Sequence, residues 1–450
     1  METAATRPWA EHAPDPGRHG GDGERSSKGD LMGKYLAYTS PARGHLYPIV
    51  DTLIELRGRG HEVAVRTLAS EVSRMQQFGF SAAPIAPAIE AIEADDWQAR
   101  TPIGANTRLL KTFARRAEHE IADIQAAIDE IEPDGVLIDI NCQGAATVAE
   151  ARRRPWAIWT PYFMPLPSRD APPFGLGIHP RNDLVGRIRD ALLAKFVLGP
   201  PERQAARSVN PLRARFGLAP FRRGTELWAV APLNLYFTAE PFEYPRSDWP
   251  DSVRLIGPGT WQPPAEPPAW LADLQRPLVL VTLSTEFQDD GKLAAVALTA
   301  LANENVEVVI TTAAVDPASF TPPPNARVER FIPHGPLIDR AACVVCHGGM
   351  GITQRALGTG VPVCVVPFGR DQLEVAGHVT RCDAGTRLAV QRLRPDRLRA
   401  AVRTTIGKHA GAQRVAAAFA RAGGAPAAAD ALEQLVNPGV EGPTHATLGT

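Results

Sequence analysis

Residues 34–67 contain the pattern that most restricts how this chain can fold. A short apolar run, YLAYT at 35–39, precedes a loop of small and polar residues, and apolar residues then recur at helical spacing over 46–59. Gly60 ends that helix, and HEVAVRT at 61–67 has the composition of a second strand. A strand, a helix and a second strand in so short a stretch form a βαβ unit, which predicts a parallel sheet covered by helices.

The strand–helix alternation continues along the chain and is interrupted once, between residues 241 and 277. This stretch includes WQPPAEPPAW and offers few core positions, which is typical of a linker between domains. In the first half we expect a helix over 106–131 and strands over 133–139 and 155–160. In the second half we expect strands at 278–285, 306–312, 327–331, 341–346 and 361–367, and helices at 292–302, after Gly351, at 372–381 and across 395–436.

We therefore predict an α/β protein with two Rossmann-like parallel-sheet domains. Residues 33–240 form the first domain, 241–277 the linker and 278–436 the second domain, and the segments 1–32 and 437–450 are predicted to be disordered. If the carboxyl edges of the two sheets face each other across a central cleft, residues at the ends of their strands come together there.

Charge and composition exclude several functional classes. The 450 residues include 48 Lys and Arg and 49 Asp and Glu, so the net charge is −1 and no basic surface for nucleic acid is indicated. The sequence has no apolar run long enough for a membrane span, and its N-terminus lacks the apolar region of a signal peptide. The five cysteines are too few and too uneven for a disulfide framework. We expect a cytoplasmic protein.

Several motifs resemble known sites, but the surrounding sequence lacks what each of those sites requires. Cys343 and Cys346 precede His347 as in a haem attachment motif, but the two cysteines are three apart on a predicted strand and therefore point to opposite faces. That geometry also excludes a zinc pair, so we expect buried structural cysteines and no metal site. The following glycines resemble a lipase oxyanion loop, but no G-x-S-x-G elbow is present. Walker A, G-x-G-x-x-G and H-E-x-x-H motifs are also lacking.

The turn HGGMG at 347–351 follows a predicted strand and opens a helix. The first amides of a helix are unpaired and partly positive, and glycines allow close approach of an anion, so the turn suits a phosphate. A turn that only serves the fold is the alternative. Thr285, Phe331 and the segment 367–372 lie at the ends of other strands of the second half, and His45 and Asp139 lie at the equivalent edge of the first half.

In these segments the chain resembles the family 1 glycosyltransferases of the GT-B fold, especially the bacterial enzymes that glycosylate natural products. The resemblance extends over residues 33–436 and is carried by ARGHLYP (42–48), RPLVLVTLST (276–285), ERFIPH (329–334), HGGMG (347–351) and GVPVCVVPFGRDQ (360–372). It implies an inverting transfer of a sugar from a nucleotide diphosphate to a small acceptor, without a metal or a bound cofactor. Alternatives are a catalytically silent auxiliary protein and a nucleotide-sugar epimerase on the same fold.

The resemblance assigns roles to the residues at the two edges. His45 matches the base that removes the acceptor proton, and Asp139 matches the carboxylate that orients it, with Asp134 as a competing candidate. Phe331 matches the ring that stacks on the nucleobase, and His334 replaces a glutamine that is common in relatives. The residues matched to the diphosphate are Thr285, His347, Gly348, Gly349, Gly351 and Thr353, and those matched to the sugar are Asp371 and Gln372.

The sequence departs from the family pattern at three positions. Ile352 stands where relatives commonly have Ser or Thr, and Ser284 where many have Gly. Arg355 stands where many have a Glu for the ribose hydroxyls, and an arginine cannot accept those hydrogen bonds. We therefore expect a donor linked to dTDP or UDP, and the loss of this acceptor favours dTDP, which lacks a 2′-hydroxyl. The alternative for Arg355 is a position facing solvent.

The acceptor side is indicated by a proline- and aromatic-rich segment at 161–180. Such a segment cannot form regular structure, and it either lines a ligand pocket or packs as a surface excursion. With Trp97, the residues Tyr162, Phe163 and Phe174 are predicted to contact an apolar natural-product acceptor. The expected partners are thus a nucleotide sugar and a small molecule, for a monomer or homodimer.

Overall fold

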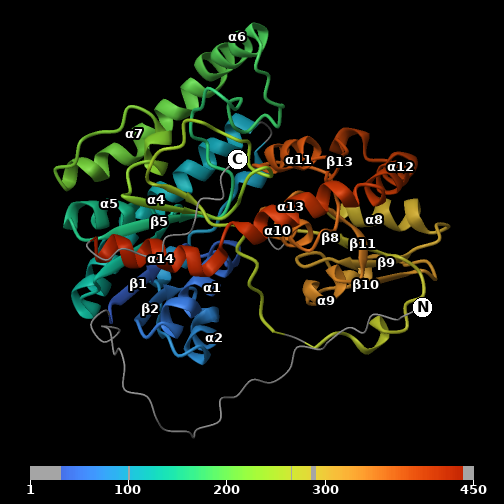
Figure 1. Cartoon of the computed structure of the whole chain (residues 1–450), viewed down its shortest axis with the longest axis horizontal. Coiled ribbons are helices and arrows are strands. Elements are labelled where there is room, and N and C mark those ends of the chain that lie inside the picture. Colours follow the sequence, from blue (N-terminus) through green and yellow to red (C-terminus); the bar gives the residue numbers. More distant parts are fainter. Residues whose placement is uncertain (1–31, 100–101, 265, 285–289, 439–450) are drawn as a thin grey trace, which may run out of the picture. The chain divides into compact units, whose positions relative to one another are not determined.

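Two parallel β-sheets, each flanked by helices, make up the computed structural model, which describes residues 32–99, 102–264, 266–284 and 290–438 (Figure 1). Within these residues the first sheet has seven strands, in the order β3 (Ser81–Pro84), β2 (Glu62–Thr67), β1 (Lys34–Tyr38), β4 (Gly135–Asp139), β5 (Trp156–Thr160), β6 (Leu233–Tyr236) and β7 (Val253–Leu255). The described part of the second sheet has six, in the order β10 (Ala326–Glu329), β9 (Glu307–Thr311), β8 (Leu278–Thr282), β11 (Ala341–Cys346), β12 (Val363–Val365) and β13 (Gly385–Arg387).

All the strand pairs are parallel, and each half of the chain begins in the middle of its sheet and winds outward. This is the doubly wound Rossmann-like arrangement, so the predicted fold class is confirmed.

The helices alternate with the strands. The first half contains α1 (Arg43–Gly58), α2 (Val72–Gln77), α3 (Pro87–Glu90), α4 (Pro102–Ile131), α5 (Gln143–Arg152), α6 (Leu184–Leu193) and α7 (Gly199–Arg215). The second half contains α8 (Gly291–Leu301), α9 (His334–Ile338), α10 (Met350–Gly358), α11 (Gln372–Arg381), α12 (Pro395–Ile406), α13 (His409–Arg421) and α14 (Gly424–Val436). Short helical turns are η1 (Ala69–Glu71), η2 (Asp96–Gln98), η3 (Ala194–Leu198), η4 (Gly224–Trp228), η5 (Ala269–Leu271), η6 (Pro317–Ser319) and η7 (Val390–Arg392).

Strand β1 shows why apolar and polar residues do not alternate along the strands. Leu36 and Tyr38 belong to the apolar core that includes residues of α4 and α5, whereas Tyr35 and Ala37 belong to the core that includes residues of α1 and α14. All four side chains are fully buried. A strand covered on both faces must be apolar at every position, which is the signal that the sequence carries.

Two elements outside the predicted first domain, β7 and α14, pack with that domain. The predicted linker, 241–277, contains β7, which pairs with β6 and extends the first sheet. Helix α14 lies within the predicted second domain but packs against α1 (Figure 1), where Arg59 Nη1 is 2.6 Å from Asp430 Oδ1. A three-residue strand is too short to show a period, and an amphipathic pattern does not specify which sheet a helix covers. The segments 1–32 and 437–450, predicted to be disordered, lie almost wholly outside the described residues.

The two halves share one apolar core. It combines side chains of the first half with side chains of the second, among them Phe163, Tyr236, Phe242, Leu278, Val344 and Val375. The chain from Gly33 onward accordingly forms one compact unit. Contacts between the halves are therefore part of the packed interior.

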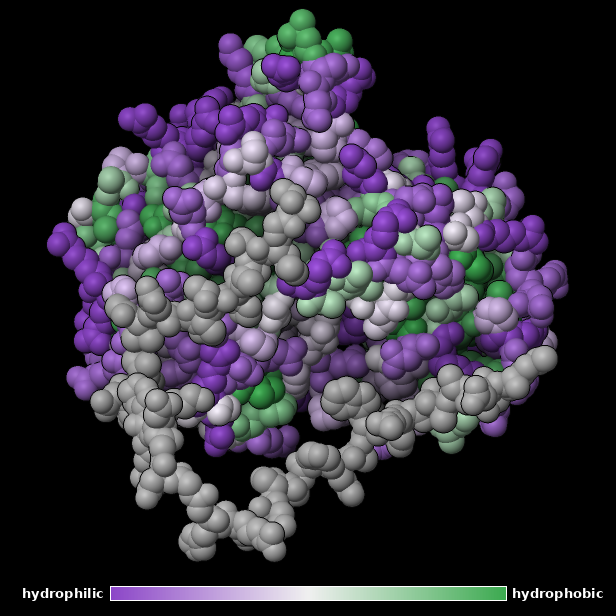
Figure 2. All heavy atoms as spheres, in the orientation of Figure 1, coloured by the Kyte–Doolittle hydropathy of each residue, from purple (hydrophilic) through white to green (hydrophobic). Residues whose placement is uncertain are grey.

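Exposed apolar side chains gather on α6 and η3. Figure 2, in the orientation of Figure 1, shows them as a green group at the top of the view; they are Leu184, Val185, Ile188, Leu192, Phe196 and Val197. These side chains are not part of any core. Among the described helices, none is both long and apolar enough to cross a bilayer.

Candidate active site

His45 and Asp139 meet at the carboxyl ends of β1 and β4. These strands are neighbours in the first sheet, so residues 94 positions apart are brought together. His45 Nδ1 lies 2.8 Å from Asp139 Oδ1. His45 is in the first turn of α1, because this helix begins at Arg43, three residues before the predicted start.

The carboxylate of Asp139 is buried and fully hydrogen-bonded. Oδ2 accepts the backbone N–H of Ser40 at 2.9 Å as well as the Ser40 hydroxyl, and Oδ1 accepts the backbone N–H of Asn141 at 3.1 Å. Burial opposes ionisation, but the charge of His45 and these hydrogen bonds outweigh it and lower the pKa of Asp139 below its ordinary value. An ionised Asp139 holds the proton of His45 on Nδ1 and leaves Nε2 as the basic nitrogen.

Asp134, the competing candidate, lies at the opposite end of β4. Its Oδ2 accepts the backbone N–H of Lys34 at 2.8 Å, at the start of β1. It therefore fixes the start of the sheet and has no place beside His45.

Asn141 and Tyr162 also lie beside the imidazole. Asn141 Nδ2 lies 3.2 Å from His45 Nε2, and the Tyr162 hydroxyl donates to Asn141 Oδ1 at 2.9 Å. The ring centroids of His45 and Tyr162 are 5.6 Å apart. Asn141 is not among the residues predicted from the sequence, although a polar residue just beyond a strand end is a signal that the sequence carries.

In the second half, β11 runs into the glycine turn that opens α10. Gly348 has φ +101°, and a Cβ there would lie 2.7 Å from Val365 Cγ1, so the turn requires glycine. A Cβ on Gly349 would lie 2.7 Å from His347 Nε2, and nothing lies within 4 Å of the corresponding position on Gly351. The predicted anion-binding turn thus has the expected backbone and an open first helical turn.

His347 is buried at this turn in its neutral form. Burial, followed by the charge of Arg370, lowers the pKa of His347 to about 4. Its Nδ1 has no hydrogen-bond partner within the described ranges. A buried polar atom of this kind is suited to a ligand.

The other residues matched to the diphosphate lie as follows. Thr353 is fully buried, with its hydroxyl 3.7 Å from Cys346 Sγ, a position that does not favour a phosphate contact. Ile352 packs against the shared core. The backbone N–H of Ser284 donates to Asp290 Oδ2 at 2.6 Å, and Thr285 lies outside the described residues.

The residues matched to the nucleoside follow β10. The Phe331 side chain is 73% exposed, which leaves its ring open to stacking. His334 begins α9, and its Nε2 lies 3.0 Å from Thr311 Oγ1. Burial, followed by the charge of Arg355, lowers the pKa of His334 to about 4, so this side chain is neutral at pH 7.

Arg355 does not face solvent. Its Nη2 donates to the backbone oxygens of Thr260 at 3.4 Å and Trp261 at 3.2 Å, so it holds the segment before the second sheet. It also lines a cavity of about 440 Å³ whose wall includes Gln262, Asp339, Thr359 and Phe419. None of the catalytic candidates lines this cavity, which extends along α10 away from the glycine turn.

Asp371 and Gln372 lie at the start of α11 and are fixed by the loop before it. Gln372 Oε1 accepts the backbone N–H groups of Phe368 at 2.7 Å and Gly369 at 3.0 Å, so a hydrogen bond from Gln372 to a ligand would have to come from its nitrogen. Burial raises the pKa of Asp371, against the charges of Arg370 and His45. Asp371 interacts electrostatically with His45 and with Tyr162. The predicted sugar-binding residue Asp371 therefore lies close to the dyad.

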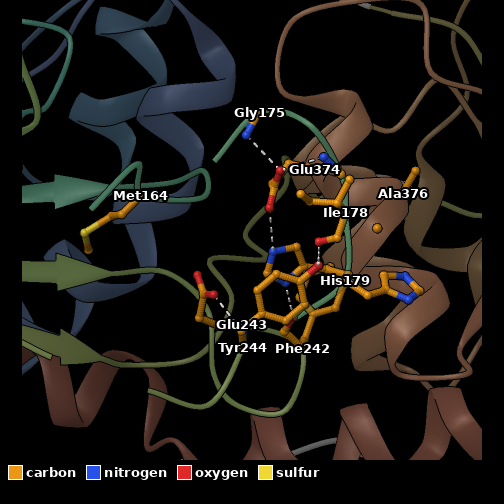
Figure 3. A network of polar contacts seen from close by, with 12 residues as sticks. Met164, Gly175, Ile178, His179, Phe242, Glu243, Tyr244, Glu374 and Ala376 are labelled. Atoms are coloured by element: carbon orange, nitrogen blue, oxygen red, sulfur yellow. Dashed lines mark hydrogen bonds and ion pairs between the residues drawn. The ribbon is translucent and has the colours of Figure 1, made fainter. Parts of the chain in front are cut away.

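The segment 161–180 contains no helix or strand, as predicted, and it docks on α11. Glu374 Oε2 accepts the backbone N–H groups of Gly175 at 2.8 Å and Gly177 at 3.0 Å (Figure 3). His378 is stacked between two rings, with its centroid 3.8 Å from that of Phe163 and 3.7 Å from that of Tyr244. The segment is therefore fixed to the helix that begins with the predicted sugar-binding pair.

This docking bears on the predicted acceptor contacts. Phe163 is 1% exposed and belongs to the shared core, so its placement favours a structural role over contact with an acceptor. Phe174 is partly buried against the same core, and Tyr162 faces the dyad. The Trp97 side chain lies outside the described residues.

The cysteines have the predicted structural placement. Cys343 and Cys346 are fully buried, and they belong to the cores on opposite faces of the second sheet. Among the described residues, no group of three or more His, Cys, Asp or Glu side chains could hold a metal ion.

Comparison with known proteins agrees with this architecture. Residues 295–437 match the family described as erythromycin biosynthesis protein CIII-like, C-terminal domain. The 4′-demethylrebeccamycin synthase of Lentzea aerocolonigenes is 33% identical over 387 residues, which are 83% of this chain and 91% of that protein. A PGL/p-HBAD biosynthesis glycosyltransferase of Mycobacterium tuberculosis strain ATCC 25177 / H37Ra is 30% identical over 330 residues, 70% of this chain and 72% of that protein.

A solved structure shows the same fold. The crystal structure of the glycosyltransferase VinC in complex with dTDP has a TM-score of 0.64 at 23% identity and covers 90% of this chain and 100% of its own. The two relatives match over most of their own length, 91% and 72%. The chain therefore belongs to the family 1 glycosyltransferases of bacterial natural-product biosynthesis, enzymes with the GT-B fold.

Proposed function

We propose that this enzyme transfers a sugar, with inversion, from a nucleoside diphosphate sugar to a hydroxyl group of a small acceptor. The observation that carries the proposal is the 2.8 Å contact between His45 Nδ1 and the ionised, buried carboxylate of Asp139. A hydroxyl is a weak nucleophile at neutral pH, and an oriented imidazole with a basic Nε2 is the group that activates it.

The transfer is a single displacement. His45 Nε2 takes the acceptor proton while the acceptor oxygen forms a bond to the anomeric carbon. The bond between that carbon and the phosphate oxygen breaks, and its electron pair leaves with the nucleoside diphosphate. Asp139 stabilises the imidazolium ion that results, as the carboxylate of a catalytic triad does.

The second half holds the donor. The first-turn amides of α10 and His347 bind the diphosphate and stabilise its charge as it leaves. The exposed ring of Phe331 stacks on the nucleobase, and Asp371 with Gln372 binds the sugar hydroxyls. No step in this scheme uses a metal ion or a resident cofactor.

The donor nucleotide is dTDP in this proposal. Arg355 replaces an acceptor of ribose hydrogen bonds with a group that only donates, and it is engaged with Thr260 and Trp261. A ribose 2′-hydroxyl would therefore gain nothing at this position. The dTDP complex of VinC supports the same nucleotide.

The acceptor is an apolar natural product that binds beside the segment 161–180, which includes Tyr162. The support is the composition of this segment and its position next to the dyad. The Lentzea relative is named as a synthase of 4′-demethylrebeccamycin, so its name gives a natural product as what it makes. An acceptor of the same class is in keeping with that name.

The proposal is tested with the full chain and a panel of nucleotide sugars and acceptors, with products detected by mass. His45→Ala is expected to abolish transfer while calorimetry shows nearly unchanged dTDP affinity. Wild-type turnover by this variant would remove His45 from the mechanism. Clearly tighter binding of UDP than of dTDP would reject the nucleotide assignment, and loss of activity on adding EDTA would reject a metal-independent reaction.

A further inference from the structure

Asn141 lies against the nitrogen of His45 that the proposed reaction uses. Asp139 is ionised and accepts from Nδ1, so a neutral His45 carries its lone pair on Nε2. Asn141 Nδ2 lies 3.2 Å from Nε2. An amide nitrogen can only donate, so this contact binds the neutral imidazole and competes with any proton that Nε2 would take up.

Tyr162 determines which way the Asn141 carboxamide points. The phenol donates to Asn141 Oδ1 at 2.9 Å, which turns the amide nitrogen toward His45. The backbone N–H of Asn141 donates to Asp139 Oδ1 at 3.1 Å, so the residue is fixed at both ends. Asn141 thus contacts the carboxylate through its main chain and the imidazole through its side chain.

We propose that Asn141, oriented by Tyr162, is a positioning residue that competes with a proton for His45 Nε2 and holds the ring in its reactive orientation until the acceptor hydroxyl replaces the amide. The inference deepens the proposed function, because it assumes that His45 is the base. Its structural content, a hydrogen bond from Asn141 to the lone pair of Nε2, does not depend on catalysis.

The charged and titratable groups around the imidazole bear on the test. Asp139 faces it from the end of β4, Tyr162 from the segment after β5, and Asp371 acts on it from the start of α11. The variants that test the inference change Asn141 and Tyr162 and leave both carboxylates in place. Loss of a donor to Nε2 makes protonation easier, and the titration midpoint of His45 rises.

The test is a titration of the histidine side chains by NMR in the full-length protein, with the His45 signals assigned by their loss in His45→Gln. For Asn141→Ala we expect the His45 midpoint to rise by about half a pH unit to one pH unit, the size of one neutral hydrogen bond. Tyr162→Phe is expected to shift it in the same direction by less. The double variant should match Asn141→Ala alone, because Tyr162 acts through Asn141.

Tyr47→Phe is the matched control. Tyr47 lies on α1 two residues after His45, but its hydroxyl accepts from Arg74 at 3.0 Å and donates to Glu71 at 3.3 Å, away from the imidazole. The titration midpoint of His45 in the Tyr47→Phe variant should equal that in the wild type. An unchanged or lowered midpoint in folded Asn141→Ala, verified by its near-UV spectrum, would overturn the inference. Additive shifts in the double variant would overturn the part assigned to Tyr162.

The outcome separates this inference from the proposed function. If His45 titrates as expected in each variant but the wild type transfers no sugar, the hydrogen bond is present and the proposed function fails. If the wild type transfers sugar and His45→Ala does not, but Asn141→Ala leaves the midpoint unchanged, the proposed function holds and the positioning role fails.

Discussion

The guanidinium of Arg370 holds both carboxylate oxygens of Asp96, with Nε 2.8 Å from Oδ2 and Nη2 2.9 Å from Oδ1. Asp96 belongs to η2 in the first half, and Arg370 has φ +52° in the loop that leads into α11. The residue after Arg370 is Asp371, the predicted sugar-binding carboxylate. This two-point ion pair therefore fixes the donor side of the site to the acceptor side.

Replacing Asp96 with Ala is expected to leave the Arg370 charge without its buried partner. Asp96 is 4% exposed and Arg370 is partly exposed, so we expect the free energy of unfolding to fall by about 2–3 kcal/mol, somewhat less than for a fully buried pair. The KM for the sugar donor should rise as Asp371 loses its fixed position. Urea unfolding and steady-state kinetics measure the two effects.

Asp95→Ala is the control for this prediction. Asp95 is adjacent to Asp96 and pairs with Arg108, but both side chains are well exposed. A surface pair of this kind contributes at most about 1 kcal/mol. Equal losses of stability in the two variants would contradict a special role for the Asp96–Arg370 pair.

The proposed dyad predicts a specific effect of Asp139→Asn. The shape of the side chain is kept, but an amide is neutral and no longer fixes the proton of His45 on Nδ1. By analogy with the carboxylate of a catalytic triad, kcat is expected to fall by about 10³- to 10⁴-fold, with little change in dTDP affinity. Single-turnover kinetics and calorimetry test this.

Asp134→Asn provides the comparison, because Asp134 lies at the far end of β4 and contacts Lys34. Its kcat should stay within a few-fold of the wild type. A large loss of kcat in this variant, or none in Asp139→Asn, would reverse the assignment of the two aspartates.

The βα alternation alone predicted the two sheets, because strands covered on both faces must be continuous apolar runs between helices. It also placed His45 and Asp139 at one edge, since the carboxyl ends of neighbouring parallel strands coincide. It could not predict Arg370–Asp96, whose partners are 274 positions apart and in different halves. Nor could it separate Phe163, which is buried against His378, from Tyr162 beside it, because an irregular segment has no period from which to read the direction of its side chains.

Glu374→Ala tests the docking of the segment 161–180 on α11. The variant leaves the backbone N–H groups of Gly175 and Gly177 without their acceptor, and an unsatisfied buried donor costs about 1–3 kcal/mol. We expect faster hydrogen exchange across residues 163–178 and earlier proteolysis within them. Mass spectrometry of the exchanged peptides measures this.

Glu374→Gln keeps a carboxamide oxygen at the same place and should retain most of the protection. If Glu374→Ala exchanges like the wild type, the segment is held by the stacking of Phe163 and Tyr244 on His378 without help from Glu374. Faster exchange in Glu374→Gln equal to that of Glu374→Ala would show that the negative charge, rather than the acceptor, is required.

Glu120 on α4 predicts a pH dependence of stability. Its carboxyl group is fully buried, and Oε2 accepts the backbone N–H of Gly144 at 2.8 Å and of Ala145 at 3.4 Å at the start of α5. Burial raises the pKa of Glu120 to about 8, although these two N–H groups oppose the shift. The folded state therefore keeps a proton that the unfolded chain releases above its ordinary pKa of 4.5, and stability falls as the pH rises from 4.5 to 8.

Glu120→Gln removes this titration while keeping an acceptor for the two N–H groups. The free energy of unfolding of the variant, relative to that of the wild type, should rise by about 3–4 kcal/mol between pH 5 and pH 8, because each pH unit in this interval costs the wild type about 1.4 kcal/mol at most. Urea unfolding at a series of pH values measures the difference, with Glu118→Gln on the exposed face of the same helix as the control. A difference between Glu120→Gln and wild type that stays constant with pH would mean that Glu120 is already ionised in the folded protein at pH 5.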